Sequence, residues 1–570
     1  MLVLLSLLSC GPKTTPTPTP QGPVTLQIAA INDWHGALYE QPVGQDEDTR
    51  WGGLPWLVGT MTALRAAHPD LIVLDGGDVF QGTWPVNASN GAGAVSAFNL
   101  LGVDAAAVGN HEFDYGGNET HPLRGHLMDG GRNAEFAWLA ANIEDGGETW
   151  QPDGFAPTAM IQRSGVQIGV IGLSTMETPQ TTLTKNVADL SFSDPVAAVA
   201  REAPRLRAQG ADVIAVVGHL TGACRPPNYT TPPPGDRCMP DGEIGRLLTE
   251  LPPGTIDVMV VGHAHTLLAQ RIDDTFVLES RDKGKMIGRL ALVVTEAGVD
   301  ADASQILPHV LITHPPTEPG CDGGTFDATP QEIGGMTVTP SEPALSLIAQ
   351  LEQEAGSLCD EIGCAAEVMT RSYDVENPVG NFVADAMLGA FPEADLAIQN
   401  PGGLRANLPS GTLRRENIQQ LMPFNNTLYL VEMTGAQVER LFEIGTSGAH
   451  GLLQVSAGTS YRYFPYEKDV VDTNGDGEAE EWEKDRLCSV DIDGGPLSPD
   501  DTYRVVTTDF LYGGGDHLGP AFEGATLVER GPLLRDVLIE AVEARPAGEC
   551  LQTDALVRAD QPRITADRCR

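Results

Sequence analysis

The side chains best suited to chemistry are metal-binding types, and they occur in five short motifs. They are Asp33 with His35, Asp78, Asn110 with His111, His219, and His263 with His265. Imidazole and carboxylate ligands together favour Zn, Mn or Fe over Mg or Ca. Two such ions can activate water and stabilise the attacking and leaving oxygens of a displacement, and Asp78 is the candidate bridging ligand. The residue types therefore predict a two-metal hydrolytic centre.

Each motif follows a short apolar run of strand-like length. The runs cover residues 26–31, 71–74, 105–108, 213–217 and 258–261, with helix-like Ala- and Leu-rich stretches between them. This alternation predicts a layered α/β architecture, in which sites gather beyond the carboxyl ends of the strands. Glycines beside four of the five motifs allow the backbone to turn sharply and approach an ion.

This series resembles the calcineurin-like metallophosphoesterases of the 5′-nucleotidase and UDP-sugar hydrolase family. Asn32-Asp-Trp-His-Gly36 and Gly109-Asn-His-Glu-Phe-Asp114 carry the resemblance most clearly. It implies an N-terminal four-layer α/β sandwich with two metal ions. By the resemblance, Asp33, His35 and His265 bind one ion, Asn110, His219 and His263 bind the other, and Asp78 bridges them.

His111 and Asp114 resemble the catalytic dyad of that family. Protonated His111 could donate to a phosphoryl oxygen as charge develops, and Asp114 could orient its ring. The alternatives are that Asp114 caps a following turn and that His111 is structural.

Four segments of the second half resemble the family's substrate-binding domain, a C-terminal mixed α/β domain. They are Asn377 to Asp385, Asn400-Pro-Gly-Gly-Leu-Arg405, Pro423-Phe424-Asn-Asn426, and Phe510 to Asp516. Phe424 and Phe510 could stack on a nucleobase, and Asp516 could accept hydrogen bonds from ribose hydroxyls. Asn400 and Arg405 lie in the loop that resembles the phosphate-contacting loop, and guanidinium groups bind phosphate well.

Some details of this domain depart from the family pattern. Pro401 stands where the family usually has glycine, and Arg371 aligns poorly with the further arginine expected upstream of Gly380. Taken alone, Phe424 or Phe510 would more often be a core residue. The four segments together favour a substrate clamp.

An acidic stretch at residues 472–483 matches the loop of an EF-hand calcium site. The candidate ligands are Asp472, Asn474, Asp476, Glu480 and Glu483, with Glu478 offering its backbone carbonyl. No helix is expected to lead into it, so it reads as one structural calcium site. The alternative is an acidic loop without metal.

We expect four regions along the chain. Residues 1–23 combine a lipoprotein-like signal ending at Cys10 with a Pro/Thr-rich linker, although no basic residue precedes the apolar run. A catalytic domain at 24–315, a linker at 316–344 and a substrate-binding domain at 345–570 follow, and apolar residues at helical spacing predict a helix over 344–358. This order predicts export to the periplasm or cell surface with a lipid anchor at Cys10. The alternative is a plain secretory signal without an anchor.

Composition limits the partners. The net charge of −43, from 35 basic and 78 acidic residues, disfavours nucleic acid as a partner. An anionic substrate must therefore be attracted locally by metals or a few arginines.

The cysteines predict disulfide bonds. Eight of the nine follow Cys10, and eight cysteines allow 105 pairings. Short spacing favours the pairs Cys224/Cys238, Cys359/Cys364 and Cys550/Cys569, which leaves Cys321 to pair with Cys488. Free thiols are the alternative.

The resemblance implies an exported dinuclear-metal phosphohydrolase that releases phosphate from small-molecule nucleotides. UDP-sugar hydrolysis and 2′,3′-cyclic nucleotide hydrolysis remain alternatives on the same metal site. A catalytically idle nucleotide-binding surface protein is less well supported, because every ligand position is filled. No protein partner is inferred, and the membrane is expected to be contacted only through the anchor.

Overall fold

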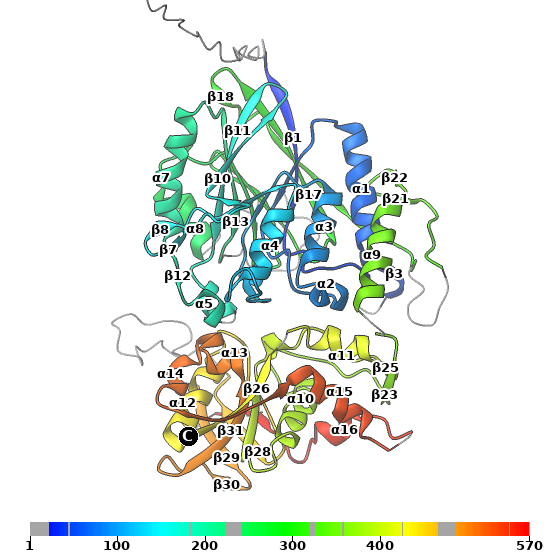
Figure 1. Ribbon diagram of the computed structural model, residues 1–570, viewed down its shortest axis with the longest axis vertical. Helices are drawn as coiled ribbons and strands as arrows, with labels where there is room; N and C mark the ends of the chain where they lie inside the picture. Colours follow the sequence, from blue (N-terminus) through cyan, green and yellow to red (C-terminus); the bar gives the residue numbers. More distant parts are fainter. Residues whose placement is uncertain are drawn as a thin grey trace, which may run out of the picture.

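The computed structural model describes residues 22–43, 46–182, 184–222, 242–317, 325–355, 358–424, 426–465, 486–546 and 548–568. It shows two bodies, one above the other in Figure 1. The predicted signal, the linker up to residue 21 and the calcium-loop residues Asp472 to Glu483 lie outside the described residues. Within those residues, no helix is both long and apolar enough to cross a membrane.

The first domain contains two large sheets. An eight-stranded sheet has the order β18-β17-β1-β4-β5-β6-β9, with β19 also pairing β17. Its strands are β1 (Val24–Ile31), β4 (Ile72–Asp75), β5 (Ala105–Ala107), β6 (Ala137–Leu139), β9 (Phe155–Ala156), β17 (Met286–Thr295), β18 (Gly298–Val299) and β19 (Gln305–Leu311). A six-stranded sheet has the order β10-β11-β13-β14-β16-β15. Its strands are β10 (Thr158–Arg163), β11 (Val166–Ser174), β13 (Val213–His219), β14 (Val258–Gly262), β15 (Leu267–Ile272) and β16 (Thr275–Ser280).

The two sheets pack face to face and helices cover their outer faces. One buried apolar cluster joins the sheets and includes Ile28, Leu74, Val217 and Val260. A second cluster lies under α1 (Leu54–Ala67), α3 (Ala92–Leu101) and α4 (Gly125–Asn133). A third lies under α7 (Pro195–Ala208) and α8 (Gly242–Glu250). These layers confirm the predicted four-layer α/β sandwich.

All five predicted apolar runs form central strands. β1, β4 and β5 are parallel neighbours in one sheet, and β13 and β14 are parallel neighbours in the other. In register, Ile31 lies beside Asp75, and Asp75 lies beside Ala106. His219 lies beside Gly262 in the second sheet. The five motifs that follow these strands therefore meet at one edge of the sandwich.

The second domain is mixed α/β. A five-stranded sheet has the order β27-β24-β31-β26-β32, and a four-stranded sheet has the order β30-β29-β28-β33. The strands are β24 (Leu396–Gln399), β26 (Thr427–Thr434), β27 (Gln454–Val455), β28 (Thr459–Tyr463), β29 (Leu487–Ile492), β30 (Gly495–Pro496), β31 (Thr502–Thr508), β32 (Thr526–Leu533) and β33 (Ile564–Ala566). The main helices are α10 (Pro378–Gly389), α11 (Arg415–Leu421), α12 (Gly435–Thr446), α13 (Asp509–Tyr512) and α15 (Leu534–Glu543).

Local sequence explains why α10 begins where it does. Pro378 occupies the first turn, where its missing N–H costs nothing. The side chain of Asn377 accepts a hydrogen bond from the Gly380 N–H at 2.8 Å and caps the helix. Farther along, Asp385 forms an ion pair with Arg563 at 2.7 Å. The predicted Asn-to-Asp segment is thus a capped helix that holds the C-terminal part of the chain.

Smaller elements complete the two domains. They are β2 (Glu40–Val43), β3 (Asp46–Gly52), β7 (Ile143–Asp145), β8 (Glu148–Thr149), β12 (Leu190–Phe192), β20 (Thr313–His314), β21 (Gln331–Ile333), β22 (Met336–Val338), β23 (Glu361–Ala365), β25 (Gly411–Arg414), α2 (Trp84–Ala88), α5 (Thr178–Thr181), α6 (Thr184–Val187), α14 (Gly519–Phe522), α16 (Thr553–Leu556), and the 3-10 turns η1 (His111–Phe113), η3 (Pro401–Gly403) and η5 (Gly515–His517).

The helix expected at the start of the second domain packs on the first. This helix, α9 (Glu342–Ala355), contacts α1, α2 and α3. Ile348 and Leu351 are buried in the apolar cluster of the first domain. Gly93 in α3 leaves room for Leu351, because a Cβ there would lie 2.7 Å from the leucine side chain. Helical periodicity indicated the helix but carried no information about which domain its apolar face would meet.

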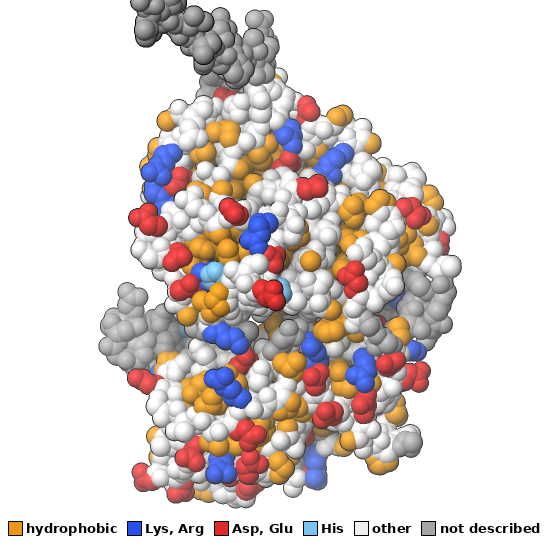
Figure 2. Space-filling view, viewed as in Figure 1, with side chains coloured by type: hydrophobic (Ala, Val, Ile, Leu, Met, Phe, Trp, Pro, Cys, Tyr) orange, Lys and Arg blue, Asp and Glu red, His pale blue; other side chains and the backbone are white. Residues whose placement is uncertain are grey.

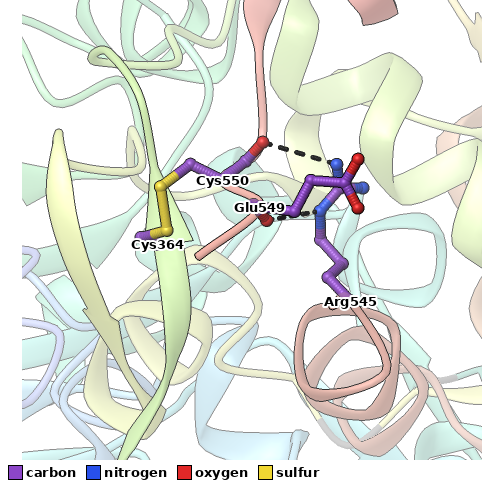
Figure 3. The surroundings of a disulfide bond; sticks show 4 residues. All are labelled: Cys364, Arg545, Glu549 and Cys550. Carbon is purple, nitrogen blue, oxygen red and sulfur yellow. Dashed lines mark hydrogen bonds between the residues drawn. A yellow bond between two sulfur atoms is a disulfide. The ribbon is translucent and has the colours of Figure 1, made fainter. Parts of the chain in front are cut away.

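A disulfide joins Cys364 in β23 to Cys550, 186 residues later. The predicted pairs Cys359/Cys364 and Cys550/Cys569 are therefore wrong. The Leu551 N–H donates to the Cys364 carbonyl, so the C-terminal segment returns beside β23. Arg545 donates to the carbonyls of Glu549 and Cys550 and holds the turn before it (Figure 3). Short sequence spacing did not reveal this tertiary pairing.

The remaining cysteines fall into two groups. Cys359 and Cys488 are also disulfide-bonded. Cys224, Cys238, Cys321 and Cys569 lie outside the described residues.

Candidate active site

The predicted metal ligands meet at the carboxyl edge of the first domain. Three groups of side chains have ligand atoms within 4.8 Å of one another: Asp33, His35 and His265; His35, Asp78 and His111; and Asp33, Asp78 and His219. His35 Nε2 lies 3.1 Å from His265 Nε2. His263 Nδ1 lies 3.1 Å from His219 Nε2. These spacings suit nitrogen atoms that share an ion at about 2.1 Å.

Asp78 lies between the two imidazole pairs. Its Oδ2 is 3.0 Å from His219 Nε2 and 3.8 Å from His35 Nε2. Burial raises the pKa of Asp78, but the nearby His219 and His111 lower it more, and its pKa lies well below the usual range. An ionised carboxylate facing both pairs has the position and charge required of a bridging ligand.

The remaining donors also fit a metal centre. Asn110 Oδ1 is buried without a hydrogen-bond partner in the described residues, while its Nδ2 donates to the Thr181 carbonyl at 3.2 Å. His219 Nδ1 lies 3.0 Å from the Gly76 carbonyl, and His35 Nδ1 lies 3.2 Å from the Gln81 carbonyl. Each carbonyl fixes the ring so that Nε2 faces the site, as is usual for metal-binding histidines.

The backbone that carries these ligands is strained. Asp33, His35, Asp78, His263 and His265 all have φ between 48° and 101°, a region that L residues seldom occupy. Such strain persists where the surroundings over-determine it, as they do in functional sites. A Cβ on Gly109 would lie 2.2 Å from Asp78 Oδ1, so only glycine fits beside this carboxylate.

Glu112 supports the site and was not predicted from the sequence. Its buried carboxylate accepts hydrogen bonds from four backbone N–H groups, those of Asp78, Val79, Phe80 and Gly109, at 2.6–3.1 Å. It therefore ties the loop after β4 to the loop after β5. The only signal in the sequence was its position inside the Asn-His-Glu motif, which did not distinguish a support from a ligand.

His111 and Asp114 form a close pair beside the metal ligands. His111 Nδ1 is 2.6 Å from Asp114 Oδ2, and Thr182 Oγ1 donates to Asp114 Oδ1 at 2.8 Å. Burial lowers the pKa of His111, but Asp114 and Asp78 raise it more, and its pKa lies above the ordinary value. The geometry favours a protonated imidazole whose Nε2 faces the site.

A cavity of about 560 Å³ opens between the two domains over this cluster. Its walls include His111, Asp114 and the ligands Asp78, Asn110, His263 and His265. All six predicted clamp residues also line it: Asn400, Arg405, Phe424, Phe510, Asp516 and Arg371. The fold therefore brings the two predicted sets of residues together.

Phe424 lies beside the catalytic pair, and Arg405 lies over Phe424. The Phe424 ring lies 5.9 Å from the His111 ring, and the Arg405 guanidinium lies 5.9 Å from the Phe424 ring. Asn400 Nδ2 donates to Asp516 Oδ2 at 2.7 Å, so its amide orients that carboxylate. Phe510 packs against Gly515, where a Cβ would lie 2.5 Å from its ring. Contacts among the clamp residues and with Gly515 therefore fix the positions of Asp516 and Phe510.

A hydrogen-bond network that the sequence did not reveal links the domains at this point. Asn87 Nδ2 in the first domain donates to the Pro423 carbonyl at 2.9 Å. Tyr115, which lines the cavity, donates to Asn87 Oδ1 at 2.7 Å. This chain of contacts positions the segment that carries Phe424 relative to the metal ligands.

Comparisons with known proteins agree with both halves of this arrangement. A model of calcineurin-like phosphoesterases matches residues 26–267, and a model of the 5′-nucleotidase C-terminal domain matches residues 356–524. A probable 5′-nucleotidase of Treponema pallidum is 26% identical over 478 residues, covering 77% of this chain and 79% of that protein. A cell wall protein of Listeria monocytogenes is 27% identical over 559 residues, covering 89% of this chain and 65% of its own length.

A solved structure shares the two-domain fold. The 5′-nucleotidase precursor from Thermus thermophilus superposes with a TM-score of 0.70 at 23% identity, covering 95% of this chain and 99% of that one. Together with the two family models, this identifies the domain that carries the candidate metal ligands as a known type. The chain belongs to the calcineurin-like phosphoesterases that carry a 5′-nucleotidase C-terminal domain, and it is a metal-dependent phosphoric ester hydrolase.

Proposed function

We propose that this chain is an extracytoplasmic, dinuclear-metal phosphohydrolase that releases phosphate from nucleotides. One observation carries the proposal: the metal-ligand cluster and the six clamp residues line a single cavity of about 560 Å³. That volume lies within the range of small-molecule sites. The cavity combines groups suited to phosphate with aromatic rings suited to a base.

The proposed metal assignment follows the geometry of the imidazole pairs. Asp33, His35 and His265 would hold one ion, Asn110, His219 and His263 would hold the other, and Asp78 would serve both. The mixed nitrogen and oxygen donors favour Zn or Mn over Mg or Ca. When bound, the two ions supply Lewis-acid stabilisation of phosphoryl oxygens and lower the pKa of water.

The catalytic pair supplies a proton donor in this proposal. His111 Nε2 donates to a phosphoryl oxygen as negative charge develops there, because its Nδ1 is engaged with Asp114. Asp114 stabilises the imidazolium, and Thr182 holds Asp114 in place. Arg405 stabilises the remaining charge by hydrogen bonding to the phosphate.

The clamp residues account for the nucleoside in this proposal. Phe424 and Phe510 present rings to the base, and Asp516 accepts hydrogen bonds from ribose hydroxyls. Asn400 orients Asp516 by the hydrogen bond between them. We assign Arg371, which also lines the cavity, to phosphate.

We propose a catalytic domain that includes α9 and a substrate-binding domain after it, because α9 packs on α1, α2 and α3. We also propose that the chain is exported and lipid-anchored at Cys10. The apolar run that ends in Leu-Leu-Ser-Cys10 supports this, and a relative in Listeria is named a cell wall protein.

Phosphate release from a substrate panel tests the proposal. The panel contains AMP, ATP, UDP-glucose, a 2′,3′-cyclic nucleotide and p-nitrophenyl phosphate, each with Zn, Mn and Co. We expect the highest kcat/KM on a nucleotide whose scissile phosphate is at the 5′ position. A higher kcat/KM on UDP-glucose or on the cyclic nucleotide would transfer the assignment to that substrate, and no turnover with any metal would reject it.

A further inference from the structure

Lys283 is a cavity residue that the two-metal chemistry and the clamp leave unassigned. It lies in the loop between β16 and β17 and lines the cavity between the domains. Its N–H donates to the Asp33 carbonyl at 2.7 Å, and Asn32 Nδ2 donates to the Arg281 carbonyl. Lys283 and Arg281 both have positive φ, 56° and 60°. The loop is therefore fixed to the strand end that carries a metal ligand.

Three cations meet in this part of the cavity: Lys283, Arg371 and Arg405. Arg371 stacks over Tyr373 at 5.3 Å, and Arg405 donates to the Gly402 carbonyl at 3.3 Å. None of the three forms an ion pair with another residue in the described part of the chain. The adjacent Asp282 instead contacts Lys285 at 2.8 Å.

Unpaired cations are unusual in a chain with more than two acidic residues for each basic one. Acidic and basic side chains are interspersed over both domains on the face in Figure 2. Asp282 and Asp374 line the same cavity, but neither forms an ion pair with these three cations among the described residues. Three like charges that two domains bring to one cavity indicate a site for a multiply charged anion.

We propose that Lys283 binds the phosphoryl group of the substrate together with Arg371 and Arg405, and that it makes the site select phosphomonoesters over phosphodiesters. This inference rests on the proposed function of the cavity. It adds a substrate-contacting residue from the catalytic domain to the two arginines of the substrate-binding domain.

The charge of the phosphoryl group explains the selectivity. A monoester carries close to two negative charges at neutral pH, since its second pKa is about 6. A diester carries one charge, and a second substituent replaces one ionised oxygen. A third cation therefore stabilises a bound monoester more than a bound diester. In a diester, the second substituent also blocks the approach of the Lys283 ammonium to the esterified oxygen.

The test uses Mn-loaded protein and the variant Lys283→Met, which keeps an unbranched side chain at the strained position. We expect kcat/KM for p-nitrophenyl phosphate to fall about 10- to 100-fold, the usual effect of losing one charged hydrogen bond. The value for bis(p-nitrophenyl) phosphate should fall less than about threefold. Lys283→Arg should restore most of the monoester activity.

Two controls separate this effect from general damage. Arg504→Met removes one charge from β31, at a half-exposed side chain that does not line the cavity, and should leave both activities unchanged. Thermal stabilisation by inorganic phosphate reports anion binding without turnover. It should shrink in Lys283→Met and persist in Arg504→Met.

The outcomes are distinct. An equal loss on monoester and diester, or no loss on either, would overturn the proposal. If the unmodified protein hydrolyses no ester, the proposed function fails while the phosphate measurement still decides the role of Lys283. In that case a retained phosphate shift in Lys283→Met would overturn the role, and its loss would support it.

Discussion

His111 Nδ1 lies 2.6 Å from Asp114 Oδ2, the shortest contact between an imidazole and a carboxylate in the described residues. This contact directs the second nitrogen of the ring toward the metal ligands, where Nε2 lies 3.9 Å from Asp78 Oδ2. The Asp114 carboxylate therefore orients the His111 ring, and the Asp78 carboxylate lies beside the free Nε2. The arrangement suits proton donation more than metal binding, because Nδ1 is already engaged.

Replacing His111 should separate turnover from metal content. We expect His111→Ala to lower kcat for an aryl phosphate about 10²- to 10⁴-fold, the usual contribution of a general acid. Metal content, measured by elemental analysis, should stay at two ions per chain. A variant that lost metal and activity in proportion would show that His111 is a ligand.

Replacing Asp114 should change the pH profile. Because the pKa of His111 is raised, its imidazolium persists to higher pH than that of a free histidine. Activity that needs the imidazolium is present below this pKa and lost as pH rises through it. Asp114→Asn removes the charge that raises the pKa most, so the alkaline limb of kcat/KM should move to lower pH. An alkaline limb at the same pH in both proteins would contradict this role.

Phe510 provides a test of base recognition. Stacking on one aromatic ring is worth about 1–3 kcal/mol per base. Phe510→Ala should therefore raise KM for AMP about 5- to 150-fold and leave p-nitrophenyl phosphate nearly unchanged. Equal losses on both substrates would mean that Phe510 supports the fold around Gly515 instead of binding the base.

The sequence was sufficient to predict that the candidate metal ligands lie close together. Each ligand follows an apolar run, and parallel strands bring the ends of such runs to one edge of a sheet. Asp33 and Asp78 therefore needed no tertiary information to be placed together. The prediction that the second domain faces this edge rested only on the family resemblance. The motifs of that domain do not indicate which surface they face.

Other parts of the site depend on contacts that periodicity and spacing do not encode. Glu112 is recognisable as a support only once two loops are seen to share its carboxylate. Lys283 is separated from Arg405 by 122 positions, and only the fold brings them into one cavity. The Cys364–Cys550 bond was missed for the same reason.

Asn110 should control one metal position. Its Oδ1 is buried without a hydrogen-bond partner in the described residues, and a bound metal ion would supply the missing partner. We expect Asn110→Ala to bind about one ion per chain where the unmodified protein binds two. Chelation should abolish activity in the unmodified protein, and Mn should restore it. Two tightly held ions in Asn110→Ala would exclude Asn110 as a ligand.

His309 should make the protein less stable in acid. It lies in β19, where Nδ1 is 3.2 Å from Met286 Sδ and Nε2 is buried without a partner among the residues that the structure describes. Burial lowers its pKa to about 4. The unfolded chain, with an ordinary pKa near 6.5, takes up a proton below that pH, whereas the folded imidazole stays neutral until about pH 4.

Stability associated with His309 is therefore present above pH 6.5 and lost as pH falls toward 4. At about 1.4 kcal/mol per pH unit, the free energy of unfolding should drop by about 2 kcal/mol more between pH 7 and 5 than it would without this group. His309→Gln should remove that extra slope, because glutamine does not titrate. Urea unfolding of both proteins at pH 7 and 5 measures the difference, and parallel losses in the two would show that the imidazole becomes protonated in the folded state as easily as in the unfolded one.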